Sequence, residues 1–126
     1  MPPIIFAYTN MLATKATNRV DVMFRAFSDR TRLRILSMLR DGELCVCHIV
    51  NVLGVPQPKA SRHLAYLRRA GLVTSRKDGQ WAYYQLAPAR NAFHQKILAC
   101  LESCFGDVPE LATDQKKLAR SKSCCS

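Results

Sequence analysis

Residues 57–86, QPKASRHLAYLRRAGLVTSRKDGQWAYYQL, decide the fold because they join one amphipathic helix to two strands. Pro58 suits a first helical position, and the apolar residues after it recur at helical spacing up to a stop at Gly71. Two β-rich runs then flank Asp78-Gly79, a pattern typical of a two-stranded hairpin. A helix followed by such a hairpin is the second half of a winged helix.

Three helices are predicted upstream of this stretch. Apolar spacing indicates helices over 20–27 and over 30–40, the second capped by Ser28-Asp29. A third helix over 44–53 is closed by Gly54. The short turn between this helix and the next is typical of a helix-turn-helix. We therefore expect a mainly α fold with a small β-hairpin, a winged helix-turn-helix.

The two ends of the chain carry further apolar helical patterns. Residues 4–14 favour a short helix, and Pro88 opens a last helix whose packing residues are Phe93, Ile97, Leu101 and Phe105. These faces have no evident partner within the chain, which favours a homodimer through the N- and C-terminal helices. Beyond Pro109 the sequence is polar. We expect a DNA-binding and dimerisation domain over 1–108 and a flexible basic tail over 109–126.

Charge points to the partner. The 126 residues include 19 Lys and Arg but only 9 Asp and Glu, a net charge of +10. Eleven of these basic residues and four acidic ones lie between Arg25 and Asp78, in the predicted DNA-binding elements. We expect neither a secretory signal, because the first residues lack a basic region, nor a membrane span, because no stretch approaches about 20 apolar residues. We therefore expect a cytoplasmic protein that binds double-stranded DNA and no membrane.

The first turns of a recognition helix reach base edges in the major groove, whereas a wing reaches phosphates or the minor groove. Each basic residue alone would more often only solvate its helix face, but the fold pattern around them favours DNA contact. The predicted DNA-binding residues are Gln57, Lys59, Ser61, Arg62 and His63 on the helix, with Arg76 and Lys77 on the wing.

The six cysteines fall into three close pairs, too few for a disulfide scaffold. Cys45 and Cys47 would point about 160° apart in a regular helix, so they can share one ion only where the helix start is distorted. Cys100 and Cys104 lie one above the other on a helix face, a spacing that suits either packing or ligation. Cys124 and Cys125 lie beside Lys and Arg, which favour the thiolate.

The stretch FRAFSDRTRLRILSMLRDGELCVCHIVNVLGVPQPKASRHLAYLRRAGLVTSRKDGQWAYYQL, residues 24–86, resembles the ArsR/SmtB family of dimeric, metal-responsive winged-helix repressors. Its most specific element is ELCVC at residues 43–47, which is closest to arsenic-responsive members. The resemblance implies a homodimer on a pseudo-palindromic operator, released when a thiophilic ion binds Cys45 and Cys47. The chain departs from the arsenic pattern at Val50, which stands in place of a third nearby cysteine. It also lacks the cysteines before Cys45 that the cadmium and lead sensors have. On the last helix it has only His94 of the His and acidic residues that the zinc sensors use.

The expected inducer is therefore As(III) or Sb(III). The alternative is a repressor of the same fold that responds to Cd(II) or Pb(II). The missing ligands must come from Cys100, Cys104, Cys124 or Cys125, of the same or the partner subunit. We expect the inducer to unwind the start of the 44–53 helix and move the recognition helices.

Other hypotheses remain open at this point. A thiol-redox or persulfide sensor would join one of Cys45 and Cys47 to a cysteine of the last helix. A constitutive DNA-binding protein would carry inert cysteines. A thiol enzyme would want a CxxC or an active-site loop on an α/β scaffold, so we expect neither an enzyme nor a small organic substrate.

Overall fold

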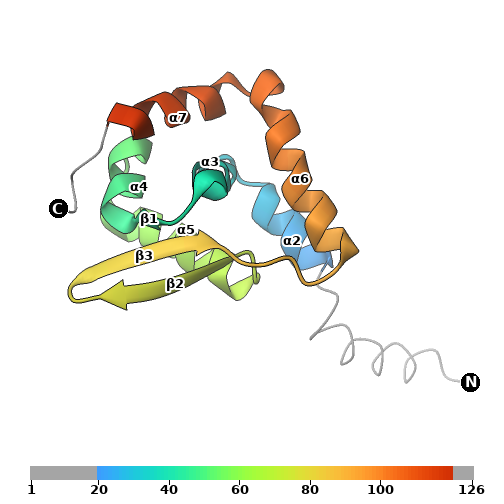
Figure 1. Ribbon diagram of the computed structural model, residues 1–126, viewed down its shortest axis with the longest axis horizontal. Helices are drawn as coiled ribbons and strands as arrows, with labels where there is room; N and C mark the ends of the chain where they lie inside the picture. The colour runs from blue at the N-terminus through green and yellow to red at the C-terminus, as the bar shows by residue number, and fades with distance from the viewer. Residues whose placement is uncertain (1–19, 121–126) are drawn as a thin grey trace, which may run out of the picture.

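A computed structural model describes residues 20–120, apart from the side chains of 104–106. The expected helix over 4–14 and the cysteines at 124 and 125 lie outside the described residues. Figure 1 shows the chain order, which is α2 (Val20–Phe27), α3 (Arg30–Met38), η1 (Leu39–Asp41), β1 (Leu44–Cys45), α4 (Val46–Leu53), α5 (Gln57–Arg69), β2 (Val73–Asp78), β3 (Trp81–Leu86), α6 (Ala92–Asp107) and α7 (Pro109–Arg120).

Helix α3 lies at the centre of the fold and contacts α2, α4, α5, α6 and α7. It begins where expected, because the Asp29 carboxylate accepts a hydrogen bond of 3.0 Å from the backbone N–H of Arg32. Ile35, Leu36 and Met38 are buried in the core that all these helices share. The last predicted turn of this helix is the short 3-10 helix η1.

The helix-turn-helix and the wing are confirmed. Helix α4 ends at Gly54, which has φ 68° and ψ 29°, a left-handed conformation that favours glycine. Ala60, Leu64 and Leu67 form the buried side of α5. Strands β2 and β3 pair in antiparallel fashion from Val73↔Leu86 to Asp78↔Trp81. The two-residue turn between them begins with Gly79 at φ 64°.

A third strand joins this hairpin, which the sequence analysis did not predict. The sheet order is β1-β3-β2, with Leu44 opposite Tyr84 and Cys45 opposite Tyr83. The prediction of a helix over 44–53 was therefore wrong at its start. Cys45 has extended backbone angles, φ −71° and ψ 146°, and precedes the helix as its N-cap residue. Pairing with β3 holds these two residues in a strand, so α4 starts only at Val46.

The C-terminal part also differs from expectation. Helix α6 begins at Ala92 rather than at Pro88, because the side-chain oxygen of Asn91 accepts a hydrogen bond of 2.8 Å from the N–H of His94. The flexible tail expected from residue 109 is wrong for residues 109–120, which form helix α7. Its Leu111 and Asp114 are buried, and α7 contacts α3, α4 and α6 (Figure 1).

Candidate functional site

The predicted recognition helix presents most of its candidate residues to solvent. Gln57, Lys59, Ser61 and Arg62 are exposed on the first two turns of α5. Pro56 precedes the helix in an extended conformation, and Pro58 stands in its first turn. The start of this helix therefore offers one amide, one hydroxyl and two cations to a partner, a set able to bond base edges.

His63 is the exception, because its ring turns toward the start of α3. Its Nδ1 lies 3.8 Å from Asp29 Oδ2, and only 17% of the side chain is exposed. Burial lowers the pKa of His63; the Asp29 charge works against this, whereas Arg32, Lys59 and Arg62 add to it. The ring is therefore neutral at neutral pH and lies against the Asp29 cap rather than fully in solvent.

A basic depression of about 460 Å³ lies along α5, and four of the residues around it carry a positive charge. The Arg32 guanidinium lies over the ring of Tyr66, 4.0 Å from its centroid. Arg32 also donates to the carbonyls of Arg25 and Ala26 at the end of α2. The cations around the depression are Arg32, Lys59, Arg62 and Arg69. Sequence reasoning missed Arg32 and Arg69, although Lys59, Arg62 and Arg69 follow helical spacing.

The two wing candidates differ in their surroundings. Lys77 is exposed on β2. Arg76 instead makes a two-pronged ion pair with Glu43, at 2.7 and 2.8 Å, and its guanidinium lies 4.5 Å from the centre of the Tyr83 ring. The hydrogen bond with Arg76 lowers the pKa of Glu43. Because Glu43 directly precedes β1, this pair joins the wing to the residues around the thiols.

Cys45 and Cys47 come together in the structure. Their Sγ atoms lie 3.2 Å apart, farther than the roughly 2.05 Å of a disulfide bond. The pair is thus two sulfurs in contact, within the separation of about 4 Å that two ligands of one ion require. The extended backbone of Cys45 makes this possible, so no unwinding of α4 is needed to bring the two sulfurs together.

Cys45 is buried, whereas Cys47 lines a hollow of about 720 Å³ between the helix-turn-helix and the wing. The hollow is lined on one side by residues of α4 and α5 and on the other by residues of the wing. These residues are Val46, Cys47, Val50, Asn51 and Gln57, and Lys77, Gln80, Trp81 and Ala82. Two predicted DNA-binding residues, Gln57 and Lys77, therefore share a cavity with one of the predicted inducer ligands. Sequence reasoning missed Trp81, which no motif singles out.

The remaining cysteines do not complete a site within the part of the chain that the structure describes. Cys100 is an exposed free thiol on α6; the buried face of this helix carries His94, Ile97 and Leu101 instead. The side chain of Cys104 and both cysteines at 124 and 125 are outside the described residues. Among the residues described, no group of three or more His, Cys, Asp or Glu is placed to hold a metal ion.

A helix-turn-helix with a three-stranded wing and a basic recognition helix defines the class of winged-helix regulators. Within residues 20–120, none of the helices is long and apolar enough to cross a membrane. The profile described as "Bacterial regulatory protein, arsR family" matches residues 29–75. With the relatives described next, this match shows that the chain belongs to the ArsR family.

Several relatives are similar in sequence to this chain over a little more than half of its length. The arsenic resistance transcriptional regulator ArsR1 of Pseudomonas putida is 50% identical over 68 residues, 53% of each chain. The arsenical resistance operon repressor of Escherichia coli is 47% identical over 77 residues, 60% of this chain and 66% of that one. A cadmium resistance regulatory protein CadC homolog of Staphylococcus aureus is 42% identical over 72 residues, 55% of this chain and 60% of its own length. The chain thus spans about half to two thirds of these relatives.

Solved structures agree with the fold. HlyU from Vibrio cholerae has a TM-score of 0.61 and 34% identity, covering 75% of this chain and 95% of its own. HlyU from Vibrio vulnificus gives a TM-score of 0.58 at 34% identity, over 79% of this chain and 98% of that protein. Both are transcriptional regulators by their descriptions, HlyU of Vibrio cholerae being called a transcriptional activator. The winged-helix prediction is confirmed by these likenesses.

Proposed function

We propose that this protein is a DNA-binding transcriptional repressor that trivalent arsenic or antimony releases from its operator. The observation that carries the proposal is the 3.2 Å contact between the sulfurs of Cys45 and Cys47. Cys45 lies in strand β1 of the wing sheet. Cys47 lies in the first turn of α4, the helix that leads into α5. In this proposal the protein is a regulator and not an enzyme, and it acts on its operator in the cytoplasm.

For DNA binding, the first turns of α5 enter the major groove and the wing follows the backbone. Gln57, Lys59, Ser61 and Arg62 supply the contacts of α5, with Lys77 on the wing. His63 contributes less than expected because it packs against Asp29. Arg76 reaches a phosphate only after it leaves Glu43.

A pseudo-palindromic operator is read by two copies of the protein, so the active form is a homodimer. Phe24 on α2 supports an interface on the terminal helices, because it is a large apolar side chain that remains 57% exposed. Its ring contacts Phe93 of α6 edge to face, with centroids 5.4 Å apart. A second copy on this face would cover both rings.

The nature of the thiol pair supports the class of inducer. Soft thiolates select soft ions such as As(III), Sb(III), Cd(II) and Pb(II), and the named relatives include both arsenic and cadmium resistance regulators. Arsenic and antimony are preferred because Cys45 and Cys47 need only one further sulfur to give the three that a trivalent ion takes. Cadmium or lead would call for two further ligands.

The sheet offers a path from the ion to the DNA-binding surface. Cys45 pairs with Tyr83 of β3, and Glu43 holds Arg76 of β2. An ion that draws the two sulfurs into its own geometry moves β1, and β1 is bonded to the wing. This replaces the expected unwinding of α4 as the proposed route of release.

Fluorescence anisotropy on a labelled duplex, selected by the protein from random sequence, tests the proposal. Arsenite and antimonite are expected to release the DNA at lower concentration than cadmium, lead, zinc or a persulfide donor. The double variant C45S/C47S should stay bound, whereas C100S, which removes an exposed thiol on α6, should respond as the unmodified protein does. Release by cadmium or lead alone would support the alternative inducer, and release by none would refute inducible control.

A further inference from the structure

We propose that the Cys45–Cys47 pair and the hollow beside it form a site for a trivalent arsenic that carries one aromatic substituent. The two sulfurs bind the arsenic, and the aromatic ring occupies the hollow between the helix-turn-helix and the wing. This inference rests on the proposed function, because it names the class of inducer that the same thiol pair takes.

The spacing of the two sulfurs fits a single arsenic atom. A trivalent arsenic is the apex of a pyramid whose three bonds lie at nearly right angles to one another. At about 2.3 Å, the length of a zinc–sulfur bond, two such bonds would hold their sulfurs about 3.3 Å apart. The Sγ atoms of Cys45 and Cys47 lie 3.2 Å apart. The pair is therefore already set for two of the three bonds.

Two sulfurs are the number that a monosubstituted arsenic takes. Arsenite has three exchangeable hydroxyl groups, so it would need one more sulfur than this pair supplies. An arsenic with one aryl group has two exchangeable hydroxyl groups and one carbon that does not exchange. Cys45 and Cys47 therefore saturate it within one chain, and the aryl group takes the third position.

The hollow lies at the open side of the pair. Cys45 is buried and Cys47 lines the hollow, so an arsenic bound to both sulfurs has the hollow on its free side. Val50 and Asn51 follow Cys47 by three and four residues, a spacing that places all three on one face of α4. All three line the hollow. The third bond of the arsenic would lead into this space.

The walls of the hollow suit an aromatic ring. Trp81 lines the wing side and lies two residues before Tyr83, which pairs with Cys45. Val46 and Val50 line the α4 side. Pairs of aromatic rings stabilise beyond the apolar area that they bury, so the Trp81 indole favours an aryl over an alkyl group. Benzene fits a cavity of about 150 Å³, and the hollow measures about 720 Å³.

A ring in the hollow would act on the DNA-binding surface directly. Gln57 at the start of α5 and Lys77 on β2 line the same hollow, and both are proposed DNA contacts. An occupied hollow would hold the first turn of α5 and the wing apart in a fixed arrangement. Arsenite, which brings no ring, would act only through the sulfurs. We therefore expect an aryl arsenical to be the stronger inducer.

The ligand exchange balances without an oxidant or a reductant. Phenylarsine oxide in water is phenylarsonous acid, which carries two hydroxyl groups on arsenic. Each exchange forms one As–S bond, breaks one As–O bond, and joins the thiol proton to the departing hydroxide as water. Two waters leave, the As–C bond stays intact and arsenic remains trivalent.

The experiment uses the full chain and three probes, which are phenylarsine oxide, methylarsonous acid and arsenite. Anisotropy on the labelled duplex gives the concentration of each probe for half-release, relative to each variant's own binding without arsenic. Phenylarsine oxide is expected to act at about 10-fold lower concentration than methylarsonous acid, because only the phenyl group reaches Trp81. This ratio should fall to near one in W81A and be kept in W81F, which retains a ring.

Equilibrium dialysis without DNA measures phenylarsine oxide binding itself. C45S/C47S should weaken it at least about 10-fold. The matched variants C100S/C104S and C124S/C125S, each of which removes another pair of cysteines, should leave it unchanged.

The outcomes are distinct. Equal potency of the phenyl and methyl probes, an undiminished ratio in W81A, or unchanged binding in C45S/C47S would each overturn the inference, while release by arsenite would leave the proposed function standing. Tight phenylarsine oxide binding that depends on Cys45 and Cys47, without release of DNA by any arsenical, would refute inducible release and support the binding site. A protein that binds none of the three probes would refute both.

Discussion

His94 is fully buried near the start of α6. Its Nδ1 accepts a hydrogen bond of 3.3 Å from the backbone N–H of Arg90. Burial lowers the pKa of His94, and the Arg90 charge lowers it further. The ring is therefore neutral in the folded protein near neutral pH.

This burial makes stability depend on pH. Below about pH 6.5 the unfolded chain protonates His94 while the folded protein does not, so the free energy of unfolding should fall as pH falls from about 7. His94→Asn keeps an acceptor near Nδ1 but cannot titrate, so its stability should fall less steeply. Urea unfolding at several pH values measures this. The pKa of His63 is lowered too, so some slope should remain, but an unchanged slope would contradict the prediction.

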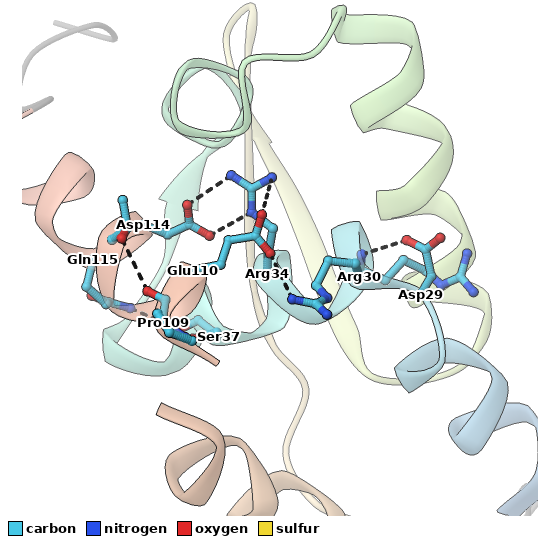
Figure 2. Close-up of polar contacts among 10 residues, drawn as sticks. Asp29, Arg30, Arg34, Ser37, Pro109, Glu110, Asp114 and Gln115 are labelled. Atoms are coloured by element: carbon cyan, nitrogen blue, oxygen red, sulfur yellow. Dashed lines mark hydrogen bonds and ion pairs between the residues drawn. The ribbon is translucent and has the colours of Figure 1, made fainter. Parts of the chain in front are cut away.

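At the scale of elements, a buried ion pair between Arg34 and Asp114 is one of the contacts that hold α7 on α3 (Figure 2). Asp114→Ala would leave the Arg34 guanidinium, which is 14% exposed, with only the more distant Glu110 carboxylate at 3.7 Å. Losing one member of a buried pair costs about 3–5 kcal/mol, and we expect a destabilisation near the lower end of that range because Arg34 keeps some contact with water.

Glu110→Gln is the matched control for this change. Glu110 approaches the same Arg34 at 3.7 Å but is 41% exposed, and exposed pairs are worth at most about 1 kcal/mol. Urea unfolding should therefore separate the two variants clearly. Equal destabilisation by both would mean that Asp114 does not fix α7.

The Glu43–Arg76 pair makes a second prediction at this scale. In the free protein Glu43 binds the Arg76 guanidinium, and under the proposed function a DNA phosphate would have to displace Glu43 to bind the same group. Glu43→Gln should therefore tighten operator binding about two- to fivefold, as measured by anisotropy. Asp41→Asn is the control, because Asp41 is exposed nearby on η1 and its substitution removes the same negative charge. In an R76A background, E43Q should change affinity no more than D41N does; a larger change would contradict the coupling.

At the scale of the whole molecule, a chain with a net charge of +10 is expected to bind DNA in a salt-dependent way, with a slope set by the number of basic side chains that contact phosphate. Operator affinity should fall steeply as salt rises, because each phosphate contact releases counterions. Lys77→Ala should weaken binding and reduce the slope of log affinity against log salt by about one. Lys96→Ala removes the same charge from the exposed surface of α6 and should leave the slope nearly unchanged. Equal effects would mean that the wing does not contact phosphate.

Periodic features were predictable because each depends on residues close in sequence. The α5 stripe of Ala60, Leu64 and Leu67 is buried as its spacing indicates, and the Asp29 cap acts three residues from its own position. Strand β1 was not predictable, since two residues carry no periodicity and their partners are Tyr83 and Tyr84, far along the chain.

Helix α7 was not predictable from the sequence for a related reason. Its inner face carries Leu111 and Leu118 but also Asp114 and Gln115, so its composition is typical of a solvated segment. The partner that makes Asp114 an interior residue is Arg34, 80 residues earlier. The sulfur contact was missed because the spacing was interpreted as helical, whereas Cys45 is extended. The candidate ligands themselves came from the motif.

The wall of the hollow beside Cys47 includes Trp81, the single tryptophan of the chain. Its indole emission therefore comes from one known place, between the thiol pair and the tip of the wing. A heavy ion bound at the sulfurs, or a wing that shifts against α4, would change that emission without any added dye. The protein thus carries its own optical probe of the proposed step between ion binding and release of DNA.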